Sequence, residues 1–256
     1  NSVMINLKIA IQKSGRLNED SLTLLKECGI SINNGKDQLM AQASNFRLDV
    51  LYLRNSDIPQ YVRDGVADIA IIGDNTEKEK KTGIRHVLDL GFSRCRLSIA
   101  VPKNVDFQDI SYLQGKKIAT SYPNSLKDFL TENDIEAEIH EISGSVEIAP
   151  NIGLADAICD LVSSGSTLFK NGLKEVYKIF ESQAILVANS GLCGEKQELL
   201  AQLVFRIKAV LAAKYNKYIL LNAPEKALDR ICRLLPGMKS PTIMPLRENG
   251  WVSVHS

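Results

Sequence analysis

The chain of 256 residues has a formal net charge of +1, with 45% hydrophobic and 24% charged residues. This length suits one large domain or two α/β lobes, and the hydrophobic content is sufficient for extended cores. A near-neutral charge provides no field that would attract a nucleic acid or an acidic membrane surface, and no apolar run approaches the length of a membrane span.

The cysteines are widely separated in the sequence: Cys28, Cys95, Cys159, Cys193 and Cys232. They form no CxxC pair, so the sequence indicates neither a zinc site nor a disulfide framework. At the amino-terminal end, charged residues and a glycine come before a signal-peptide core could form. We therefore expect reduced thiols in a cytoplasmic protein.

The first part of the chain predicts strands and helices in alternation. Three apolar segments have the length and residue types of buried strands: 7–12, 48–53 and 67–73. Between them we expect a helix over residues 19–28, capped by Asn18, and a short helix over 57–63, opened by Asp57. This order predicts a parallel sheet covered by helices.

A second lobe is predicted to start after the apolar segment 96–102. Its expected elements are strands at 117–121, 136–142 and 157–162 and a helix near 124–132. A strand at 183–189 would cross back to the first lobe, followed by one long amphipathic helix over 195–216. Two crossings of the chain between the lobes predict a cleft with a hinge.

The charged runs at 77–81 and 195–198 are predicted to be solvated faces, and the three histidines to be structural or at the surface.

The most informative stretch runs from residue 147 to residue 168. The strand at 157–162 leads into a polar loop of Ser163, Ser164, Gly165, Ser166 and Thr167, and a short helical turn follows. Hydroxyls and backbone N–H groups converge in such a loop, which makes it a candidate phosphate-binding site. Three nearby acids suit sugar hydroxyls or a Mg²⁺ ion: Glu147, Asp156 and Asp160. The loop alone leaves open a plain polar turn with solvated acids.

The whole pattern resembles the signature of ATP phosphoribosyltransferase, the first enzyme of histidine biosynthesis. Its fixed positions are filled by Glu147, Gly153, Ala155, Ile158, Asp160, Leu161, Ser164, Gly165, Thr167 and Leu168. Further similar segments are residues 11–17, 57–73, 95–102, 117–123 and 235–246. The resemblance therefore extends over nearly the whole chain.

The resemblance implies an α/β fold whose catalytic core has two lobes and a central cleft, as in type II periplasmic binding proteins. Catalytic lobe I would comprise residues 1–99 and 185–217, and lobe II, which binds 5-phosphoribosyl 1-pyrophosphate (PRPP), would comprise residues 100–184. Residues 218–256 resemble the start of the ferredoxin-like regulatory domain of the long-form family. The elements expected there are a strand at 218–222, a helix at 224–235 and strands at 241–246 and 251–255.

In the long-form family, histidine is a feedback inhibitor that binds between regulatory domains, and the enzymes are homo-oligomers, dimers that assemble into hexamers. A complete regulatory domain would continue with a further helix and strand after Ser256. The sequence leaves open whether the polypeptide continues, and with it whether histidine inhibits.

The reaction implied by the resemblance transfers the 5-phosphoribosyl group of PRPP to N1 of ATP and releases pyrophosphate. Mg²⁺ is the implied cofactor, carried by the pyrophosphate of PRPP, with its protein ligands left open. Residues 163–167 would bind the 5′-phosphate, while Glu147, Asp156 and Asp160, together with Arg16, would form the catalytic group. Loops after the predicted strands would supply further substrate contacts: Lys13, Ser14, Gly15, Arg16, Arg54, Asp57, Gly73, Asp74, Ser121 and Tyr122. Simpler alternatives remain for several residues. Lys13 and Arg16 could belong to a solvated loop between a strand and a helix, and Asp57 could be only a helix cap. Arg96, at the crossing between the lobes, could form a hinge ion pair rather than bind a ligand.

Three other functions remain as alternatives. A two-lobed ligand-binding or sensor module would share the fold without catalysis, but the acid-rich loop argues against it. A nucleobase-salvage phosphoribosyltransferase would carry two adjacent acids directly before the loop, where this chain has Asp160 followed by Leu161. A catalytically inactive relative is disfavoured by the complete signature.

Overall fold

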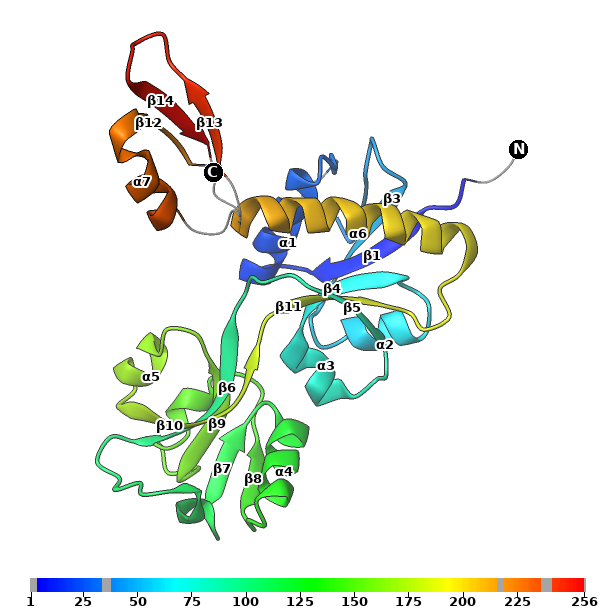
Figure 1. Cartoon of the computed structure of the whole chain (residues 1–256). Coiled ribbons are helices and arrows are strands. Elements are labelled where there is room, and N and C mark those ends of the chain that lie inside the picture. Colours follow the sequence, from blue (N-terminus) through cyan, green and yellow to red (C-terminus); the bar gives the residue numbers. More distant parts are fainter. Residues whose placement is uncertain (1–3, 34–37, 216–218, 236–240, 256) are drawn as a thin grey trace. The chain divides into compact units, whose positions relative to one another are not determined.

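The computed structural model describes residues 4–33, 38–215, 219–235 and 241–255. The chain divides into two compact units, Asn1–Ile207 and Lys208–Ser256. The first unit contains two mixed β-sheets, each with its own helices, and the second contains one antiparallel sheet (Figure 1).

The first sheet has six strands in the order β2-β3-β1-β4-β11-β5. Their bounds are β1 (Leu7–Gln12), β2 (Met40–Gln42), β3 (Leu48–Leu53), β4 (Ile69–Gly73), β5 (Arg85–Asp89) and β11 (Ala184–Ala188). The helices that accompany them are α1 (Arg16–Glu27), α2 (Ile58–Arg63), α3 (Asp74–Lys80) and α6 (Gly194–Tyr215). As predicted, β1, β3 and β4 are parallel, but β2 and β11 run antiparallel to their neighbours, so the sheet is mixed. We call this sheet with its helices the first lobe.

The second sheet has the order β10-β6-β9-β7-β8. Its strands are β6 (Cys95–Pro102), β7 (Lys117–Thr120), β8 (Glu138–Glu141), β9 (Ala157–Val162) and β10 (Leu173–Ser182). Its helices are η1 (Ile110–Leu113), α4 (Pro123–Glu132), η2 (Val146–Ile148) and α5 (Ser166–Lys170). We call this sheet with its helices the second lobe.

The two faces of the second sheet carry separate apolar cores. One core contains Cys159 of β9 with Leu126 and Phe129 of α4. The other contains Ile158, the neighbour of Cys159, together with Val162 and, from α5, Leu168. Because successive side chains of a strand point to opposite faces, β9 packs against both cores. This strand leads directly into the polar loop.

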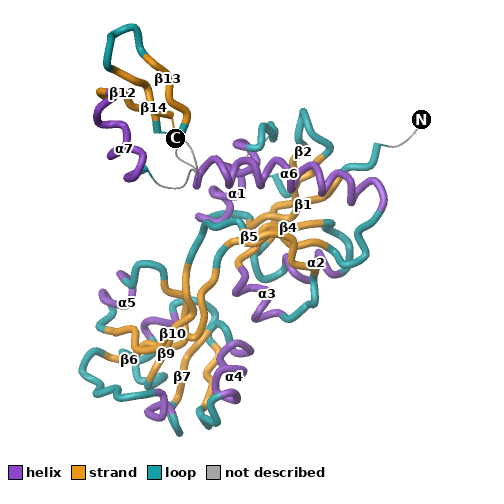
Figure 2. The backbone as a smooth tube through the Cα atoms, in the orientation of Figure 1, coloured by secondary structure: helices purple, strands orange, loops and turns teal. Residues whose placement is uncertain are grey.

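Two segments of the chain connect the lobes and are hydrogen-bonded to each other. Leu90 donates its N–H to the Ala184 carbonyl at 2.9 Å, and Ala184 donates to the Phe92 carbonyl at 2.9 Å. The predicted pair of crossings is therefore present, and Figure 2 shows the two strand-like segments running between the sheets. The lobe border expected at residue 99 falls inside β6, which begins at Cys95 and belongs entirely to the second sheet.

The structure corrects several predicted elements. Helix α1 begins at Arg16, three residues before the predicted start, with Gly15 at the cap position. Asn18 lies inside the helix and donates its side-chain amide to the Gln12 carbonyl at 2.7 Å, so its predicted role as cap is wrong. The ten-residue strand β10 was not predicted, because it is an edge strand with two irregularities in register and many exposed polar side chains.

The second unit contains a three-stranded sheet in the order β12-β14-β13. Its elements are β12 (Leu220–Pro224), η3 (Glu225–Ala227), α7 (Leu228–Leu234), β13 (Thr242–Pro245) and β14 (Trp251–His255). This is the predicted strand–helix–strand–strand order. The expected strand start at residue 218 and the helix end at residue 216 lie outside the described residues. Ala223, Val252 and Val254 are buried in this unit.

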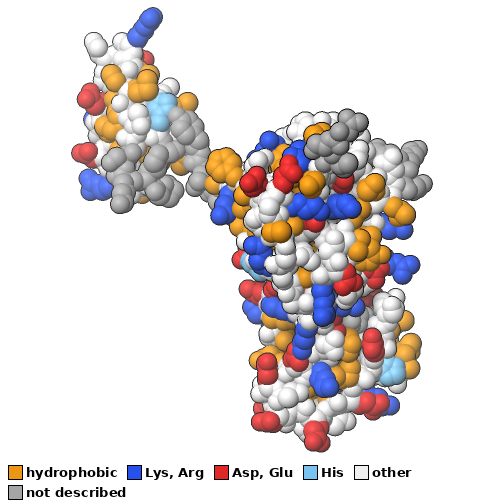
Figure 3. All heavy atoms as spheres, turned by 90° about the vertical axis from the view of Figure 1, so that its right-hand side faces the viewer, with side chains coloured by type: hydrophobic (Ala, Val, Ile, Leu, Met, Phe, Trp, Pro, Cys, Tyr) orange, Lys and Arg blue, Asp and Glu red, His pale blue; other side chains and the backbone are white. Residues whose placement is uncertain are grey.

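The surface carries both signs of charge. Figure 3 shows acidic and basic side chains interspersed over the visible face of the first unit, in keeping with the net charge of +1. Among the described residues, no helix has the length and apolar character needed to cross a membrane.

Candidate active site

The polar loop after β9 forms a small pocket with two of the predicted acids. Residues 161–168 line this pocket of about 220 Å³ together with Glu147 and Asp160. Gly165 has a φ of +80°, a left-handed conformation that glycine adopts without strain. Ser164 and Ser166 are joined through their hydroxyls at 3.0 Å. We call this the acidic pocket.

The helix that follows the loop is too short to have a strong macrodipole. Helix α5 covers only Ser166–Lys170, little more than one turn. Because a macrodipole builds up from aligned peptide units, its contribution here is small. The capacity of the loop to bind an anion therefore depends on its hydroxyls and nearby N–H groups.

Asp160 is the electrostatically unusual member of the pocket. Its pKa is raised to about 6, mainly by burial and to a lesser extent by the charge of Glu147, although a hydrogen bond from the Leu161 N–H at 2.8 Å opposes the shift. The pKa of Tyr122 is also raised, first by burial and then by the charge of Asp160. Asp160 therefore lies close enough to Glu147 and to Tyr122 to interact with each of them.

Arg96 supports the polar loop from the neighbouring strand. Its Nη1 donates to the Ser163 carbonyl at 3.0 Å, while its Nε and Nη2 each donate to the Glu175 carboxylate at 2.7 Å. The Ser98 hydroxyl also donates to Glu175, at 3.3 Å. These hydrogen bonds from Arg96 lower the pKa of Glu175. Glu175 lies on β10, so this ion pair is within the second lobe and is not the hinge pair considered from the sequence.

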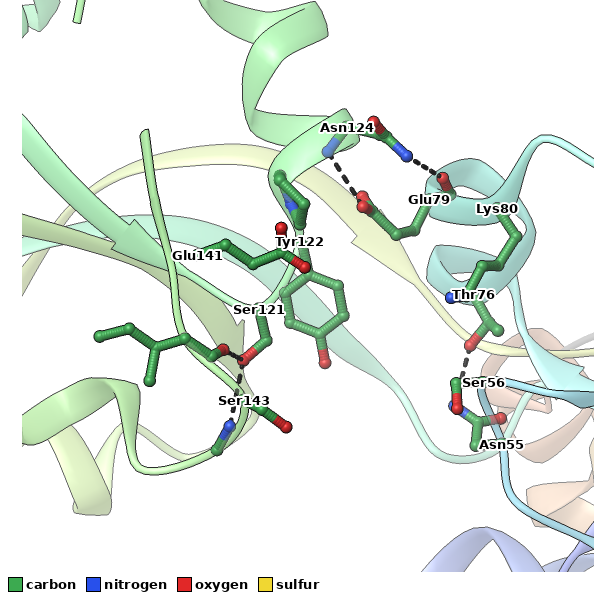
Figure 4. A pocket seen from close by; sticks show the side chains of 13 residues that line it. Asn55, Ser56, Thr76, Glu79, Lys80, Ser121, Tyr122, Asn124, Glu141 and Ser143 are labelled. Carbon is green, nitrogen blue, oxygen red and sulfur yellow. Dashed lines mark hydrogen bonds between the residues drawn. The ribbon is translucent and has the colours of Figure 1, made fainter. Parts of the chain in front are cut away.

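A larger hollow of about 920 Å³ lies between the lobes (Figure 4). The first lobe contributes Asn55, Ser56, Thr76, Glu79 and Lys80, and the second contributes Ser121, Tyr122, Pro123, Asn124, Glu141, Ile142, Ser143 and Gly144. We call this hollow the interlobe cleft. The labelled side chains of the two lobes face one another across it in Figure 4.

Hydrogen bonds fix several groups of the cleft. Ser121 donates its hydroxyl to the Ile142 carbonyl at 2.5 Å, and Asn55 donates its side-chain amide to the Thr76 hydroxyl at 3.0 Å. The Asn55 Oδ1 is buried and, among the described residues, has no hydrogen-bond partner. An orphaned acceptor in a cleft wall is a contact point for a ligand donor. Of the cleft residues, the sequence had predicted only Ser121 and Tyr122.

The cationic residues after β1 and β3 lie next to each other outside both pockets. Lys13 donates its N–H to the Leu53 carbonyl at 2.8 Å, so the loop after β1 runs beside the end of β3, where Arg54 follows. Ser14, Gly15 and Arg16 complete this loop and are exposed, and Arg16 forms a 3.7 Å ion pair with Asp20.

The other predicted residues of the first lobe have local roles in the structure. Asp57 is the cap residue of α2 but makes no side-chain cap bond. Asp74 pairs with Lys78 at 2.8 Å. A Cβ on Gly73 would collide with the Asn75 Oδ1, so a larger residue at this position would displace the Asn75 side chain.

Asp156 lies apart from the acidic pocket. It precedes β9, whereas the polar loop follows β9, and about 20 Å of extended strand separates the two ends. Its Oδ2 accepts the Lys117 N–H at 2.9 Å, and its own N–H donates to the Lys117 carbonyl at 2.8 Å. The structure thus joins Asp156 to the start of β7 and brings only Glu147 and Asp160 to the loop.

The donor set of the acidic pocket suits a magnesium ion that arrives with a substrate phosphate. Within the described ranges, no group of three or more His, Cys, Asp and Glu side chains is arranged to hold a metal. Mg²⁺ is usually bound by one or two carboxylates completed by phosphate oxygens and water. Glu147 and Asp160 meet that requirement beside the loop.

Comparison with known proteins gives consistent matches along the chain. The family model for ATP phosphoribosyltransferase (HisG) matches residues 54–209, and the model described as "HisG, C-terminal domain" matches residues 213–256. The ATP phosphoribosyltransferase of Cytophaga hutchinsonii is 58% identical over 98% of this chain and 87% of the relative. That of Phocaeicola vulgatus is 54% identical over 98% of this chain and 88% of the relative.

Solved structures agree at the level of fold. The chain superposes on the ATP phosphoribosyl transferase (HisG:HisZ) complex from Thermotoga maritima with a TM-score of 0.70 and 28% identity, covering 80% of this chain and 98% of that one. A substrate-binding protein of an amino acid ABC transporter, 12% identical, matches with a TM-score of 0.54 over 81% of this chain and 94% of that one. The second likeness concerns the two-lobed fold alone, which is the predicted periplasmic-binding-protein type. The matches of sequence and structure together show that this chain belongs to the ATP phosphoribosyltransferase family.

Proposed function

We propose that this protein transfers the 5-phosphoribosyl group of PRPP to N1 of the adenine of ATP and releases pyrophosphate, the first step of histidine biosynthesis. The observation that carries this proposal is the acidic pocket, in which Glu147 and Asp160 lie beside a hydroxyl-rich loop with a left-handed glycine. A sugar phosphate requires that combination, since the phosphate needs donors and the ribose hydroxyls need acceptors.

In this proposal the acidic pocket holds PRPP. The hydroxyls and N–H groups of residues 163–167 bind the 5′-phosphate, and Glu147 and Asp160 accept hydrogen bonds from the ribose hydroxyls. The same carboxylates, with the pyrophosphate of PRPP, would be the oxygen donors for Mg²⁺. The chemistry that Mg²⁺ would supply there is neutralisation of the charge on the departing pyrophosphate.

ATP is assigned to the first-lobe side of the interlobe cleft. Lys13, Arg16 and Arg54 follow neighbouring strands at the carboxyl edge of the sheet, where ligands of such sheets bind. Their charges suit the triphosphate. Asn55, with its unpartnered Oδ1, suits the exocyclic amine of adenine. Ser121 and Tyr122 lie on the opposite wall, and Tyr122 is also close enough to Asp160 to interact with its charge.

The chemistry requires positioning more than a protein nucleophile. N1 of adenine is the attacking atom, and the reacting sugar carbon develops positive charge as pyrophosphate leaves. A carboxylate near that carbon stabilises the developing charge, and Asp160 with Glu147 provides it. Holding both substrates in one cleft converts a bimolecular encounter into an oriented reaction within the complex.

The second unit is assigned a regulatory role. Residues 213–256 match the C-terminal domain of the family. We propose that histidine binds to this unit as a feedback inhibitor and that the protein works as a homo-oligomer.

The borders of the two catalytic lobes follow the strands of the two sheets. Residues 1–94 with 183–207 would serve as the nucleotide lobe, and residues 95–182 would serve as the PRPP lobe. The Thermotoga protein was solved as a complex with a second protein.

The test is a reaction with ATP, PRPP and Mg²⁺, in which pyrophosphate and the nucleotide product are both quantified. The proposal expects equal amounts of pyrophosphate and of ATP that carries phosphoribose on N1. Product formed with free adenine but not with ATP would favour a salvage enzyme. Tight binding of either substrate without product would favour a ligand-binding module of the same fold.

A further inference from the structure

The first turn of helix α4 is capped by a side chain of the other lobe. Pro123 occupies the first helical position and has no N–H group. Asn124 donates its N–H to Oε1 of Glu79 at 2.9 Å, and Ser125 donates its N–H to Oε2 at 2.8 Å. Leu126 is the next residue, and its N–H donates to the Tyr122 carbonyl at 3.0 Å. Tyr122, at the cap position, makes no side-chain cap bond, so Glu79 satisfies the N–H groups that the helix leaves open.

Glu79 is buried, and the cap accounts for its burial. Its side chain is enclosed with 7% of the residue exposed, and it accepts a further bond from the Ser125 hydroxyl at 2.9 Å. The Asn124 side-chain amide donates to the Glu79 carbonyl at 3.1 Å. A buried carboxylate is costly unless hydrogen bonds compensate it, and the start of a helix favours an anion. Glu79 sits in the last turn of its own helix, where an acid gains nothing from the dipole.

The opposite end of α3 is held at the crossing between the lobes. Asn75 donates its N–H to the Ser182 hydroxyl at 2.9 Å, and that hydroxyl donates to the Asn75 Oδ1 at 2.9 Å. Asp74 donates its N–H to the Gln183 carbonyl at 2.9 Å. Helix α3 therefore runs from the returning chain segment at one end to the start of α4 at the other.

We propose that Glu79 is a positioning residue that sets the register of the two lobes. By capping α4 from α3, it fixes Ser121 and Tyr122, which immediately precede α4, opposite Asn55 and Thr76 of the interlobe cleft. Figure 4 shows this arrangement, with Glu79 and Asn124 joined beside the cleft residues. The catalytic part of this inference rests on the proposed function, whereas the cap is a property of the fold alone.

The experiment compares Glu79→Gln with Glu77→Gln in the full chain. Glu77 lies on the same helix, but its carboxylate accepts from the Thr82 hydroxyl at 2.6 Å and from the Gly83 N–H at 2.8 Å, both within the first lobe. A glutamine at position 79 has the size of the glutamate and keeps one acceptor oxygen. In place of the other oxygen it has an NH₂ group, which faces the donor groups of Asn124 or Ser125 and cannot accept from them. Amide hydrogen exchange of Asn124 and Ser125 reports the cap directly, and steady-state kinetics with ATP, PRPP and Mg²⁺ report the register.

In Glu79→Gln we expect the exchange of the Asn124 and Ser125 amides to become about tenfold faster. We also expect kcat to fall about tenfold while the KM for PRPP changes less than threefold, because the acidic pocket lies wholly in the second lobe. Glu77→Gln should leave the exchange of both amides and kcat within about twofold of the unaltered protein.

Unchanged exchange in Glu79→Gln would overturn the cap, and faster exchange with unchanged kcat would overturn the positioning role. If Glu79→Gln fails to fold, Ser125→Ala replaces it, because it removes one of the three bonds to the carboxylate and leaves the backbone donors in place. Ser125→Ala should speed the exchange of the two amides and lower kcat, each by about threefold. If neither quantity changes, the proposal is contradicted. An unaltered protein without transferase activity would overturn the proposed function, while the exchange data would still decide the cap.

Discussion

Asp160 is the group on which the pH behaviour of the acidic pocket depends. Burial and the neighbouring Glu147 raise its pKa from 3.8 to about 6. The folded protein therefore binds the carboxyl proton of Asp160 more tightly than the unfolded chain does. Between about pH 4 and pH 6 the stability contributed by Asp160 falls as the pH rises, and above that window the full cost of the buried charge is present.

We predict that Asp160→Asn is more stable than the unaltered protein at about pH 8, by on the order of 2 kcal/mol, because the buried charge is gone. At about pH 4 the two proteins should unfold with similar free energies, since Asp160 is then protonated. Urea unfolding at both pH values measures the difference. A variant that is less stable at both would show that the carboxylate supports the fold, and its assignment to the substrate would lose its basis.

Gly165 is the residue that sets the shape of the polar loop. Its φ of +80° is strained for any residue with a Cβ, although no atom would contact that Cβ within 4 Å. We predict that Gly165→Ala lowers the unfolding free energy by about 1 kcal/mol and raises the KM for PRPP about tenfold. The KM for ATP should change much less.

Gly115 offers a matched control for this substitution. It has a φ of +72°, equal space for a Cβ, and a position before β7 that lines neither pocket. Gly115→Ala should cost similar stability and leave the KM for PRPP unchanged. Equal KM values in the two variants would remove the loop from the binding site.

Three strands of the second sheet meet at Arg96. Arg96 lies on β6. Two of its guanidinium nitrogens donate to the Glu175 carboxylate on β10, and the third donates to the carbonyl of Ser163, the residue that follows β9. Since the C=O and N–H of one peptide point in opposite directions, fixing the Ser163 carbonyl also fixes the direction of the Ser164 N–H. Arg96 thereby orients a donor of the polar loop.

We predict that Arg96→Lys raises the KM for PRPP by roughly fivefold. A lysine cannot keep both the two-pronged hydrogen bond to the Glu175 carboxylate and the hydrogen bond to the Ser163 carbonyl. The KM for ATP should stay within about twofold. Lys178→Gln is the control, since it breaks an exposed pair with Glu181 whose side chains are 49% and 75% exposed. A rise of both KM values in parallel in Arg96→Lys would indicate general loosening of the sheet.

The elements that could be predicted are those whose own residues show the pattern of a strand or a helix. Strands β1, β3, β9 and β14 match their predicted bounds, because each is a short apolar or alternating run. The edge strand β10 and the half-exposed β5 have no such pattern. The charged run 77–81 was predicted to be solvated, yet Glu79 is buried, since its partners lie more than 40 residues away in the chain.

The same reasoning explains the outcome for the site. The polar loop is continuous in sequence, so its residues could be named in advance. Asp156 and Asp160 are close in sequence, but Asp156 precedes β9 whereas Asp160 lies within it, two residues before its end, so about 13 Å of extended strand separates them. The interlobe cleft combines short segments of two lobes, and its residues Asn55, Thr76 and Glu141 follow from the topology and not from any local motif.

At the scale of the whole molecule, the two units can be observed separately. The single tryptophan of the chain, Trp251, lies in β14 of the second unit and is 38% exposed. Its fluorescence therefore reports on the unit to which we assign histidine binding. We predict that histidine shifts the Trp251 emission at the concentrations at which it inhibits turnover, because a regulator acts through its own binding equilibrium. Inhibition without any change in emission would place the histidine site elsewhere.

The central claim is that Glu147, Asp160 and residues 163–167 of this chain hold PRPP for transfer to ATP. The most direct measurement is a single-turnover reaction with enzyme in excess over PRPP, in which N1-phosphoribosylated ATP is followed by mass spectrometry in the unaltered protein, Asp160→Asn and Asp156→Asn. The account predicts product from the unaltered protein, a rate at least about 100-fold lower in folded Asp160→Asn, and a rate within about threefold in Asp156→Asn. Equal rates in the unaltered protein and Asp160→Asn, or a loss confined to Asp156→Asn, would contradict it.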